Sequence, residues 1–280
     1  MTTPQELVSD VHSLMSLPDI YVQIRDAIND PKTTLTKIAD LVGRDANIAV
    51  RILRIANSSF FGFAEEITTI SRAINIMGLS HLHDLVLSVS VVRSFKGVPN
   101  NLINMKTFWT NSVFCAVASR LLAAQCSILD SERLFVSGLL HEIGHLIIFS
   151  KLPAETTEIL TQAIQQHRPI AQVERHVLGF DYAQVGGELL KNWKMPQSHI
   201  EAVGCHTDIR GADKYALDTA LVHIASVLSQ QAESDLKGYG PAQIDPLAMQ
   251  LTGLEPANID DIRLEASKNV TEVLRLLFSK

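Results

Sequence analysis

The stretch LFVSGLLHEIGHLIIF, residues 134–149, decides the fold. Apolar residues at helical spacing surround a polar island made of His141, Glu142 and His145. We expect one helix across 131–149, in which His141 and His145, four residues apart, lie on the same face. Unpaired polar groups in an apolar setting cost roughly 1–3 kcal/mol each. The island therefore faces a metal ion, a hydrogen-bond network or solvent.

The composition favours packed helices. Of 280 residues, 46% are hydrophobic and only 6% aromatic, and the net charge is −6. A chain of this size can bury a large core, and the acidic balance argues against a general nucleic-acid surface. Three cysteines, Cys115, Cys126 and Cys205, lie far apart without CxxC spacing, which indicates reduced thiols in a cytoplasmic protein. We expect no signal peptide and no membrane association, since no apolar run approaches the about 20 residues that span a bilayer.

Turn signals predict an all-α protein with two helical lobes. The Gly, Pro and Asn residues of FKGVPNNL, residues 95–102, mark the boundary between the lobes. Thr34 and Asp45 are candidate N-caps for helices near 35–42 and 47–57. No strand-like alternation of any length occurs. The expected organisation is a lead-in helix at 1–16, a first lobe at 17–100, a second lobe at 101–235, and a C-terminal loop and packing helix at 236–280.

Two motifs in the chain allow other functions. HEIGH, residues 141–145, fits the H-E-x-x-H zinc-protease pattern, in which Glu155, Glu158 or Glu174 would supply a third ligand. No further motif of that class follows, because the next residues read LIIFSK. The hairpin near 35–57 carries arginines at 44, 51 and 54, which suggests DNA binding. With the acidic balance, a solvated face of an ordinary hairpin is the better interpretation.

Several motifs together resemble one known family. They are Phe108 to Ser112 (FWTNS), Ser137 to Gly144 (SGLLHEIG), Asp45 to Asn47 with Leu53 to Ser58, Ile67 to Ile70, Ala73-Ile74 with Leu79, His176 with Gly179, Trp193 to Pro196 with Ile200, and His206. This combination, over about residues 15–230, resembles the HDOD domain (HD-related output domain), a degenerate branch of the HD superfamily of metal-dependent phosphohydrolases. The resemblance implies a two-lobed helical fold whose second lobe, 101–235, is HD-like.

The resemblance also implies a metal site with altered ligands. The two positions of the HD pair fall on His141 and Glu142, and further ligand histidines fall on His176 and His206. The first ligand histidine of the family falls on Asn111, and the terminal aspartate on Ser226. His145 and Asp208 lie nearby in the sequence. We interpret His145 as a core histidine, His199 and His223 as packing or surface residues, and His167 as solvent-exposed.

By this resemblance the function is a non-catalytic regulatory or scaffolding role in bacterial signal transduction. No cofactor is required, although the surviving residues allow weak binding of a divalent metal such as Mn, Mg, Fe, Ni or Zn. The expected partners are signalling proteins, for example a kinase or a cyclic-dinucleotide enzyme, and a second copy of the chain is a further candidate. The alternative is a metal-dependent phosphohydrolase with a remodelled site, using His141 and Glu142.

Overall fold

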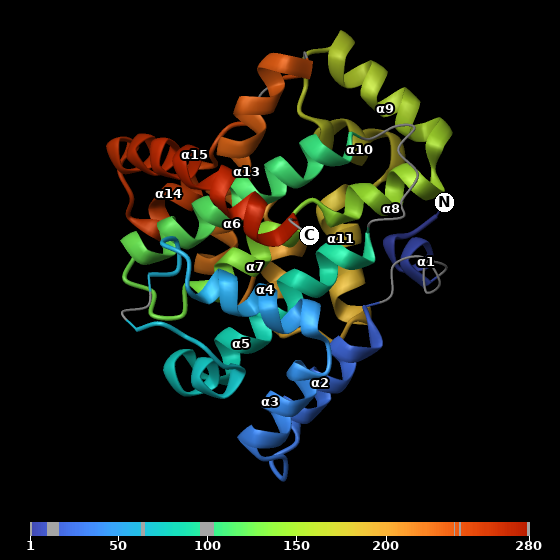
Figure 1. Cartoon of the computed structure of the whole chain (residues 1–280). Coiled ribbons are helices and arrows are strands. Elements are labelled where there is room, and N and C mark those ends of the chain that lie inside the picture. The colour runs from blue at the N-terminus through green and yellow to red at the C-terminus, as the bar shows by residue number, and fades with distance from the viewer. Residues whose placement is uncertain are drawn as a thin grey trace. The chain divides into compact units, whose positions relative to one another are not determined.

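The computed structural model describes residues 2–9, 17–62, 65–95, 104–237, 239–240 and 242–278. Every regular element in these ranges is helical, and none of the described residues forms a strand, so the all-α prediction is confirmed. The helices follow one another from α1 to α15 (Figure 1). One short 3₁₀ helix, η1, lies between α12 and α13.

The backbone divides into two compact units. The first contains residues 1–13 and 98–270, and the second contains residues 14–97 and 271–280. The last helix, α15 (Pro256–Phe278), is shared: its residues up to Val270 belong to the first unit and those from Thr271 to the second. The candidate site lies within the first unit.

The second unit is built on three helices of 9 to 11 residues and one of 25, which is kinked at Gly78. They are α2 (Asp19–Asn29), α3 (Leu35–Gly43), α4 (Ala46–Ala56) and α5 (Ile70–Ser94). Thr34 and Asp45 accept backbone hydrogen bonds at the starts of α3 and α4, as predicted. Buried Tyr21 places its hydroxyl 2.9 Å from Nε2 of His83, whose Nδ1 lies 3.1 Å from a carboxylate oxygen of Asp84. These bonds tie α2 to α5.

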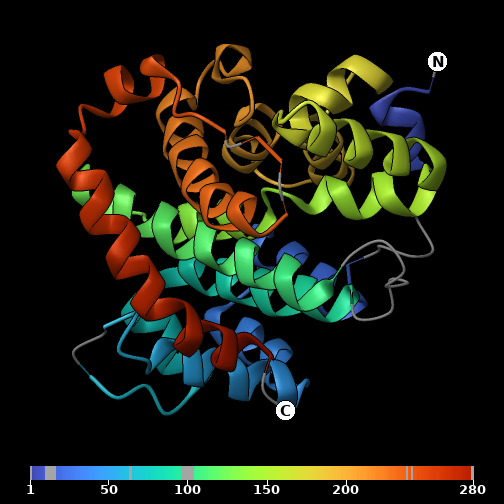
Figure 2. The same cartoon turned by 90° about the horizontal axis from the view of Figure 1, so that it is seen from above.

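The first unit is a helical body centred on α6, α7 and α13, which contact one another. Figure 2 shows α13, in orange, lying along α6, in green. Its helices are α1 (Pro4–Ser9), α6 (Met105–Gln125), α7 (Glu132–Leu140), α8 (Ile143–Lys151), α9 (Pro153–Gln165), α10 (Ile170–Leu178), α11 (Tyr182–Asn192), α12 (Gln197–Cys205), η1 (Ile209–Gly211), α13 (Ala216–Lys237) and α14 (Pro246–Thr252).

Two glycines set how closely the helices of this body approach. A Cβ on Gly138 of α7 would lie 2.7 Å from the Cα of Ala116 on α6. A Cβ on Gly144 of α8 would lie 2.0 Å from the carbonyl oxygen of Tyr182 and 2.8 Å from the amide nitrogen of Gly186, both on α11. Only glycine allows backbone contacts this close. The residues between Gly138 and Gly144 are therefore held between α6 and α11.

Two stretches, Ile70–Val92 and Glu132–Lys151, are long and apolar enough to cross a membrane by length and composition alone. In the fold, 61% and 83% of their most apolar windows are buried. Helices in the core of a protein show this same pattern, because a helix that is apolar on all sides must be covered. These stretches are therefore weak evidence for membrane insertion.

Candidate functional site

The helix predicted across 131–149 is two helices, so that prediction is wrong. α7 ends at Leu140, α8 begins at Ile143, and Glu142 between them leaves helical geometry with φ −104° and ψ 14°. The break has a packing cause, because α7 lies against α6 whereas α8 lies against α11. His141 and His145 consequently do not lie on one continuous helix, which is the geometry that the zinc-protease pattern requires.

His141 and His206 form a buried pair of imidazoles. Their rings meet edge to face with centroids 5.5 Å apart, and they are 0% and 1% exposed. The Nδ1 atom of each lies 2.8 Å from a carbonyl oxygen three residues earlier, that of Gly138 for His141 and that of Val203 for His206. A carbonyl oxygen can only accept, so each Nδ1 carries the hydrogen and each Nε2 presents a lone pair. Burial lowers the pKa of His141 to about 3 and lowers the pKa of His206 well below its usual value, so both rings are neutral near pH 7.

Tyr182, the first residue of α11, donates a hydrogen bond from its hydroxyl to Nε2 of His206. Its hydroxyl lies 3.1 Å from Nε2 of His206 and also accepts a hydrogen bond of 2.9 Å from the side-chain amide of Gln230. The same amide donates to the hydroxyl of Ser226 over 3.1 Å. A capping box positions Tyr182, because Asp181 caps the helix that starts with it. The result is a continuous neutral network from α12 through α11 to α13.

A second cluster extends from Glu142. One oxygen of its carboxylate accepts a hydrogen bond of 3.2 Å from the hydroxyl of Ser112, and the other lies 4.0 Å from Nδ1 of His145. On the other edge of the ring, Nε2 of His145 lies 3.2 Å from Oε1 of Glu174, without hydrogen-bond geometry. His145 thus sits between two buried carboxyl groups.

Aromatic rings and backbone bonds hold this second cluster in place. The ring of His145 stacks on Tyr182 with centroids 3.9 Å apart, and on Phe149 with centroids 5.0 Å apart. Glu174 is 0% exposed and accepts the backbone N–H of Tyr182 over 2.8 Å. Burial raises the pKa of Glu174, while His145 and the backbone bond act in the opposite direction. Tyr182 therefore touches both clusters.

The structure brings together some, not all, of the residues predicted as metal ligands. His141, Glu142 and His206 are buried in the clusters described above, and Ser226, 2% exposed, joins them through Gln230. Asn111 is half-buried on α6, one residue before the serine that binds Glu142. The sixth predicted residue lies on α10 and is exposed.

That residue is His176, whose side chain is exposed. Asp208 is also exposed and lies 3.8 Å from the guanidinium of Arg210. In the described part of the chain, no hydrogen bond or ion pair joins either residue to the buried clusters. A ligand role for His176 stays a prediction.

The remaining histidines among the described residues of this unit have structural roles or face solvent. Nδ1 of His223 donates to the carbonyl of His206 over 2.7 Å, and its Nε2 accepts the backbone N–H of Asp245 over 2.9 Å. His199 is buried with its Nδ1 2.9 Å from the hydroxyl of Ser137. His167 is exposed, as expected.

The donor set does not fit the divalent metal that the resemblance implies. Among the described residues of this unit, no three ligand atoms of the clusters lie within 4.8 Å of one another. Nε2 of His141 is buried without a hydrogen-bond partner, so one imidazole donor is available, but Nε2 of His206 already accepts from Tyr182. Asn111 and Ser226 supply only neutral oxygens. Catalytic zinc sites use three protein ligands and an open position, a number that this arrangement does not reach.

Tyr182 and Gln230 are the functional candidates that the sequence analysis missed, and Glu174 entered it only as a ligand of the rejected protease pattern. The signal that was available is D-Y-A-Q at 181–184, an Asp and Gln at capping-box spacing that places Tyr182 at the start of a helix. No sequence pattern connects that helix start with His206, 24 residues later.

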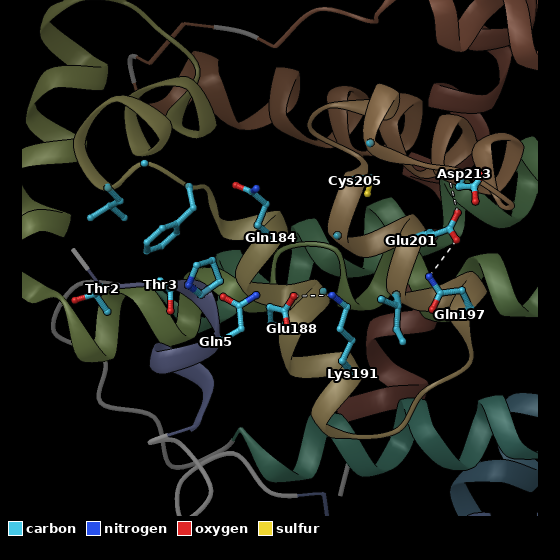
Figure 3. Close-up of a pocket in the computed structure, with 18 residues that line it drawn as sticks. Thr2, Thr3, Gln5, Gln184, Glu188, Lys191, Gln197, Glu201, Cys205 and Asp213 are labelled. Atoms are coloured by element: carbon cyan, nitrogen blue, oxygen red, sulfur yellow. Dashed lines mark hydrogen bonds and ion pairs between the residues drawn. The ribbon is translucent and has the colours of Figure 1, made fainter.

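Two cavities adjoin or approach this region. A cavity of ≈ 100 Å³ opens beside the neutral network, and its lining includes Arg175, Tyr182, His206, Thr207, Ser226 and Gln230. A larger cleft of ≈ 780 Å³ lies between α1, α11 and α12, and its described lining contains none of the six predicted ligands. Figure 3 shows the polar contacts of this cleft: the ion pair of Glu188 with Lys191, and the hydrogen bonds that Glu201 accepts from Gln197 and from the backbone N–H of Asp213.

Comparison with known proteins identifies the family and the fold. The family model for the HDOD domain matches residues 14–209. An HDOD domain protein with unknown function from Geobacter sulfurreducens superposes with a TM-score of 0.73 at 23% identity, covering 99% of both chains. The "Putative phosphohydrolase" of Shewanella amazonensis SB2B superposes with a TM-score of 0.72 at 22% identity, covering 97% of this chain and 98% of that one. At such identities the likeness shows the fold alone.

One curated relative also matches, an uncharacterized protein from Treponema pallidum (strain Nichols). It is 23% identical over 203 residues, which are 71% of this chain but 38% of that protein. The chain therefore spans well under half the length of the curated relative that it matches.

Proposed function

This chain belongs to the HDOD domain family, related to the HD phosphohydrolases, and we propose from that premise that it is a non-catalytic regulatory or scaffolding domain of bacterial signal transduction. The observation that carries the proposal is the hydrogen bond of 3.1 Å between Tyr182 and Nε2 of His206. It commits one of the two best-placed imidazole donors to the protein itself. A group held in this way orders the core and does not coordinate a metal.

The charge of the site supports the same conclusion. Hydrolysis of a phosphoester by a metal requires anionic or imidazole ligands that fix the ion and lower the pKa of a bound water. Neutral Asn111 and Ser226 occupy the positions where the resemblance expects a histidine and an aspartate. Glu142 is then the one carboxylate left among the six predicted ligands, and Ser112 and His145 already contact it. This set can hold a folded core together without holding a reactive ion.

The proposed partners are signalling proteins, such as a kinase or a cyclic-dinucleotide enzyme, and a second copy of the chain. The proposed location is the cytoplasm, which the free thiols of Cys115, Cys126 and Cys205 support, because reducing compartments keep cysteines unpaired. The net charge of −6 disfavours a nucleic-acid partner.

A metal-dependent phosphohydrolase with a remodelled site is the second candidate. The observation in its favour is that Nε2 of His141 is fully buried and has no hydrogen-bond partner, next in sequence to the carboxylate of Glu142. Metal-bound histidines often donate Nδ1–H to a backbone carbonyl, as His141 does to Gly138.

Hydrolysis assays with added Mn²⁺ separate the two candidates. The substrates are a generic phosphodiester and a cyclic dinucleotide, and the proteins are the wild type, the double variant His141→Ala with Glu142→Ala, and the exposed control His167→Ala. We expect all three to show only the background rate of Mn²⁺ alone. Mn²⁺-dependent turnover that the double variant loses and the control keeps would establish the enzyme and end the regulatory proposal.

A further inference from the structure

The hydroxyl of Tyr182 has a defined direction in its hydrogen bond with His206. Nδ1 of His206 donates to the carbonyl of Val203, so Nε2 must be the acceptor. Tyr182 is therefore the donor, and its oxygen in turn accepts from the amide of Gln230 over 2.9 Å. In this series of hydrogen bonds, every hydrogen that one group donates is accepted by a lone pair of the next. The network is therefore complete without a metal ion.

His141, the other imidazole of the pair, has an unoccupied lone pair. Nε2 of His141 has a lone pair, the ring is 0% exposed, and no hydrogen-bond partner reaches that nitrogen. The two rings meet edge to face with centroids 5.5 Å apart. The pair thus consists of one imidazole whose lone pair is occupied and one whose lone pair is not.

We propose that the Tyr182 hydroxyl is the group that excludes a transition-metal ion from the His141–His206 pair, and that removing this hydroxyl uncovers a latent two-imidazole site. The inference rests on the proposed non-catalytic function and names one side chain that keeps a metal ion away from His206. Tyr182 acts through His206, so it is a specificity-determining residue and not a catalytic one.

The chemistry of the uncovered donors selects the ion. Two neutral imidazole nitrogens favour borderline ions such as Zn²⁺, Co²⁺ and Ni²⁺ over Mg²⁺ and Ca²⁺, which prefer oxygen ligands. The cavity of ≈ 100 Å³, whose lining includes Tyr182, His206 and Ser226, has room for waters on the His206 side of the pair. Because Ser226 and His206 both line this cavity, Ser226→Asp would add an anionic oxygen on the His206 side of the pair.

Four proteins test the proposal: the wild type, Tyr182→Phe, Ser226→Asp and the double variant. Phenylalanine keeps the ring that stacks on His145 and removes only the hydroxyl. Tyr215→Phe, the same chemical change outside the cluster, is the matched control. Co²⁺ titration followed by visible d–d absorption reports the ligand geometry, calorimetry with Zn²⁺ reports affinity, and circular dichroism verifies that each variant is folded.

We expect Tyr182→Phe to bind Co²⁺ and Zn²⁺ at least tenfold more tightly than the wild type, and the double variant to bind more tightly still. Ser226→Asp alone and Tyr215→Phe should match the wild type, since Tyr182 still occupies His206 in both. Adding His206→Ala to Tyr182→Phe should abolish the gain.

The outcomes distinguish this inference from the proposed function. A folded Tyr182→Phe that binds no better than the wild type overturns the role of Tyr182, and if the double variant also gains nothing, the latent site is refuted. Neither result creates hydrolytic turnover, so the regulatory proposal would stand. Wild-type protein that binds Zn²⁺ tightly through His206 would overturn the inference, and if it also hydrolysed phosphoesters, the proposed function would fail as well.

Discussion

Acidification should destabilise the first unit through its neutral histidines, and His141 makes the effect measurable. An unfolded histidine titrates near pH 6.5, whereas burial lowers the pKa of His141 to about 3 in the fold. Between these values the unfolded chain binds the extra proton, so the free energy of unfolding falls as pH falls. The contribution is fully present above pH 6.5 and is lost progressively toward pH 3. From pH 7 to pH 5 the loss is about 2 kcal/mol for one histidine that stays neutral when folded.

The variant His141→Gln isolates this contribution. Glutamine does not titrate, and it keeps an amide donor for the carbonyl of Gly138. Urea unfolding at pH 7, 6 and 5 can be followed by the fluorescence of Trp109 and Trp193, which are 6% and 7% exposed and both lie in the first unit. We expect the stability lost between pH 7 and pH 5 to be about 2 kcal/mol smaller in the variant than in the wild type.

His167→Gln provides the control, since it makes the same replacement at an exposed position and leaves the His141–His206 pair intact, so the loss caused by the pair should remain. The comparison uses only pH-dependent differences, so any constant cost of replacing a buried ring cancels. Parallel losses in His141→Gln and the wild type would mean that the folded protein protonates His141 as readily as the unfolded chain. That result would refute the assignment of His141 and His206 as a neutral buried pair.

Four further substitutions test the packing. Gly144→Ala should cost about 3 kcal/mol of stability, because its Cβ would lie 2.0 Å from a backbone oxygen of α11. Gly43→Ala, whose Cβ would have nothing within 4 Å, should stabilise its helix by about 0.5–1 kcal/mol. Equal melting temperatures of the two variants would contradict the close approach of Gly144 to α11. Tyr21→Phe should cost about 1 kcal/mol and speed amide exchange in α2, since it removes a hydrogen bond of 2.9 Å to α5. Arg133→Met should lower the free energy of unfolding in urea by about 3 kcal/mol, because it removes two hydrogen bonds of 2.9 Å to the carboxylate of Asp218, which is 5% exposed. An unchanged free energy of unfolding would show that water replaces these bonds.

The sequence alone determined the features that depend on near neighbours. Thr34 and Asp45 cap α3 and α4 because an N-cap bonds to backbone groups two or three residues ahead. Ile48, Ile52 and Ile55 follow one another at intervals of three or four residues, which puts them on one face of α4, and all three are buried. His141 and Glu142 stood out as polar residues in an apolar stretch, and both are buried in the structure.

The sequence could not reveal where the helix through this stretch breaks. Local propensity over 131–149 favours one continuous helix, and it is overridden at Glu142 by packing on two different helices. The deciding contacts are close approaches of Gly138 to α6 and of Gly144 to α11. In the sequence, a glycine within a helix indicates only a low helix propensity. The neighbouring helix in the structure shows that no larger residue fits at that position.

Only the tertiary structure decided which donors of the candidate site are occupied. The hydroxyl of Tyr182 meets His206 because α11 and α12 pack together and direct the two side chains to one point. From the sequence alone, a histidine nitrogen can equally bind a metal ion or accept a hydrogen bond from a hydroxyl. The tautomer of the ring and the group that contacts it decide between the two. Helix formation depends on groups within about four residues, so sequence predicts it. Which group occupies the lone pair of a histidine depends on contacts between residues far apart in the sequence. Only the packed core determines those contacts.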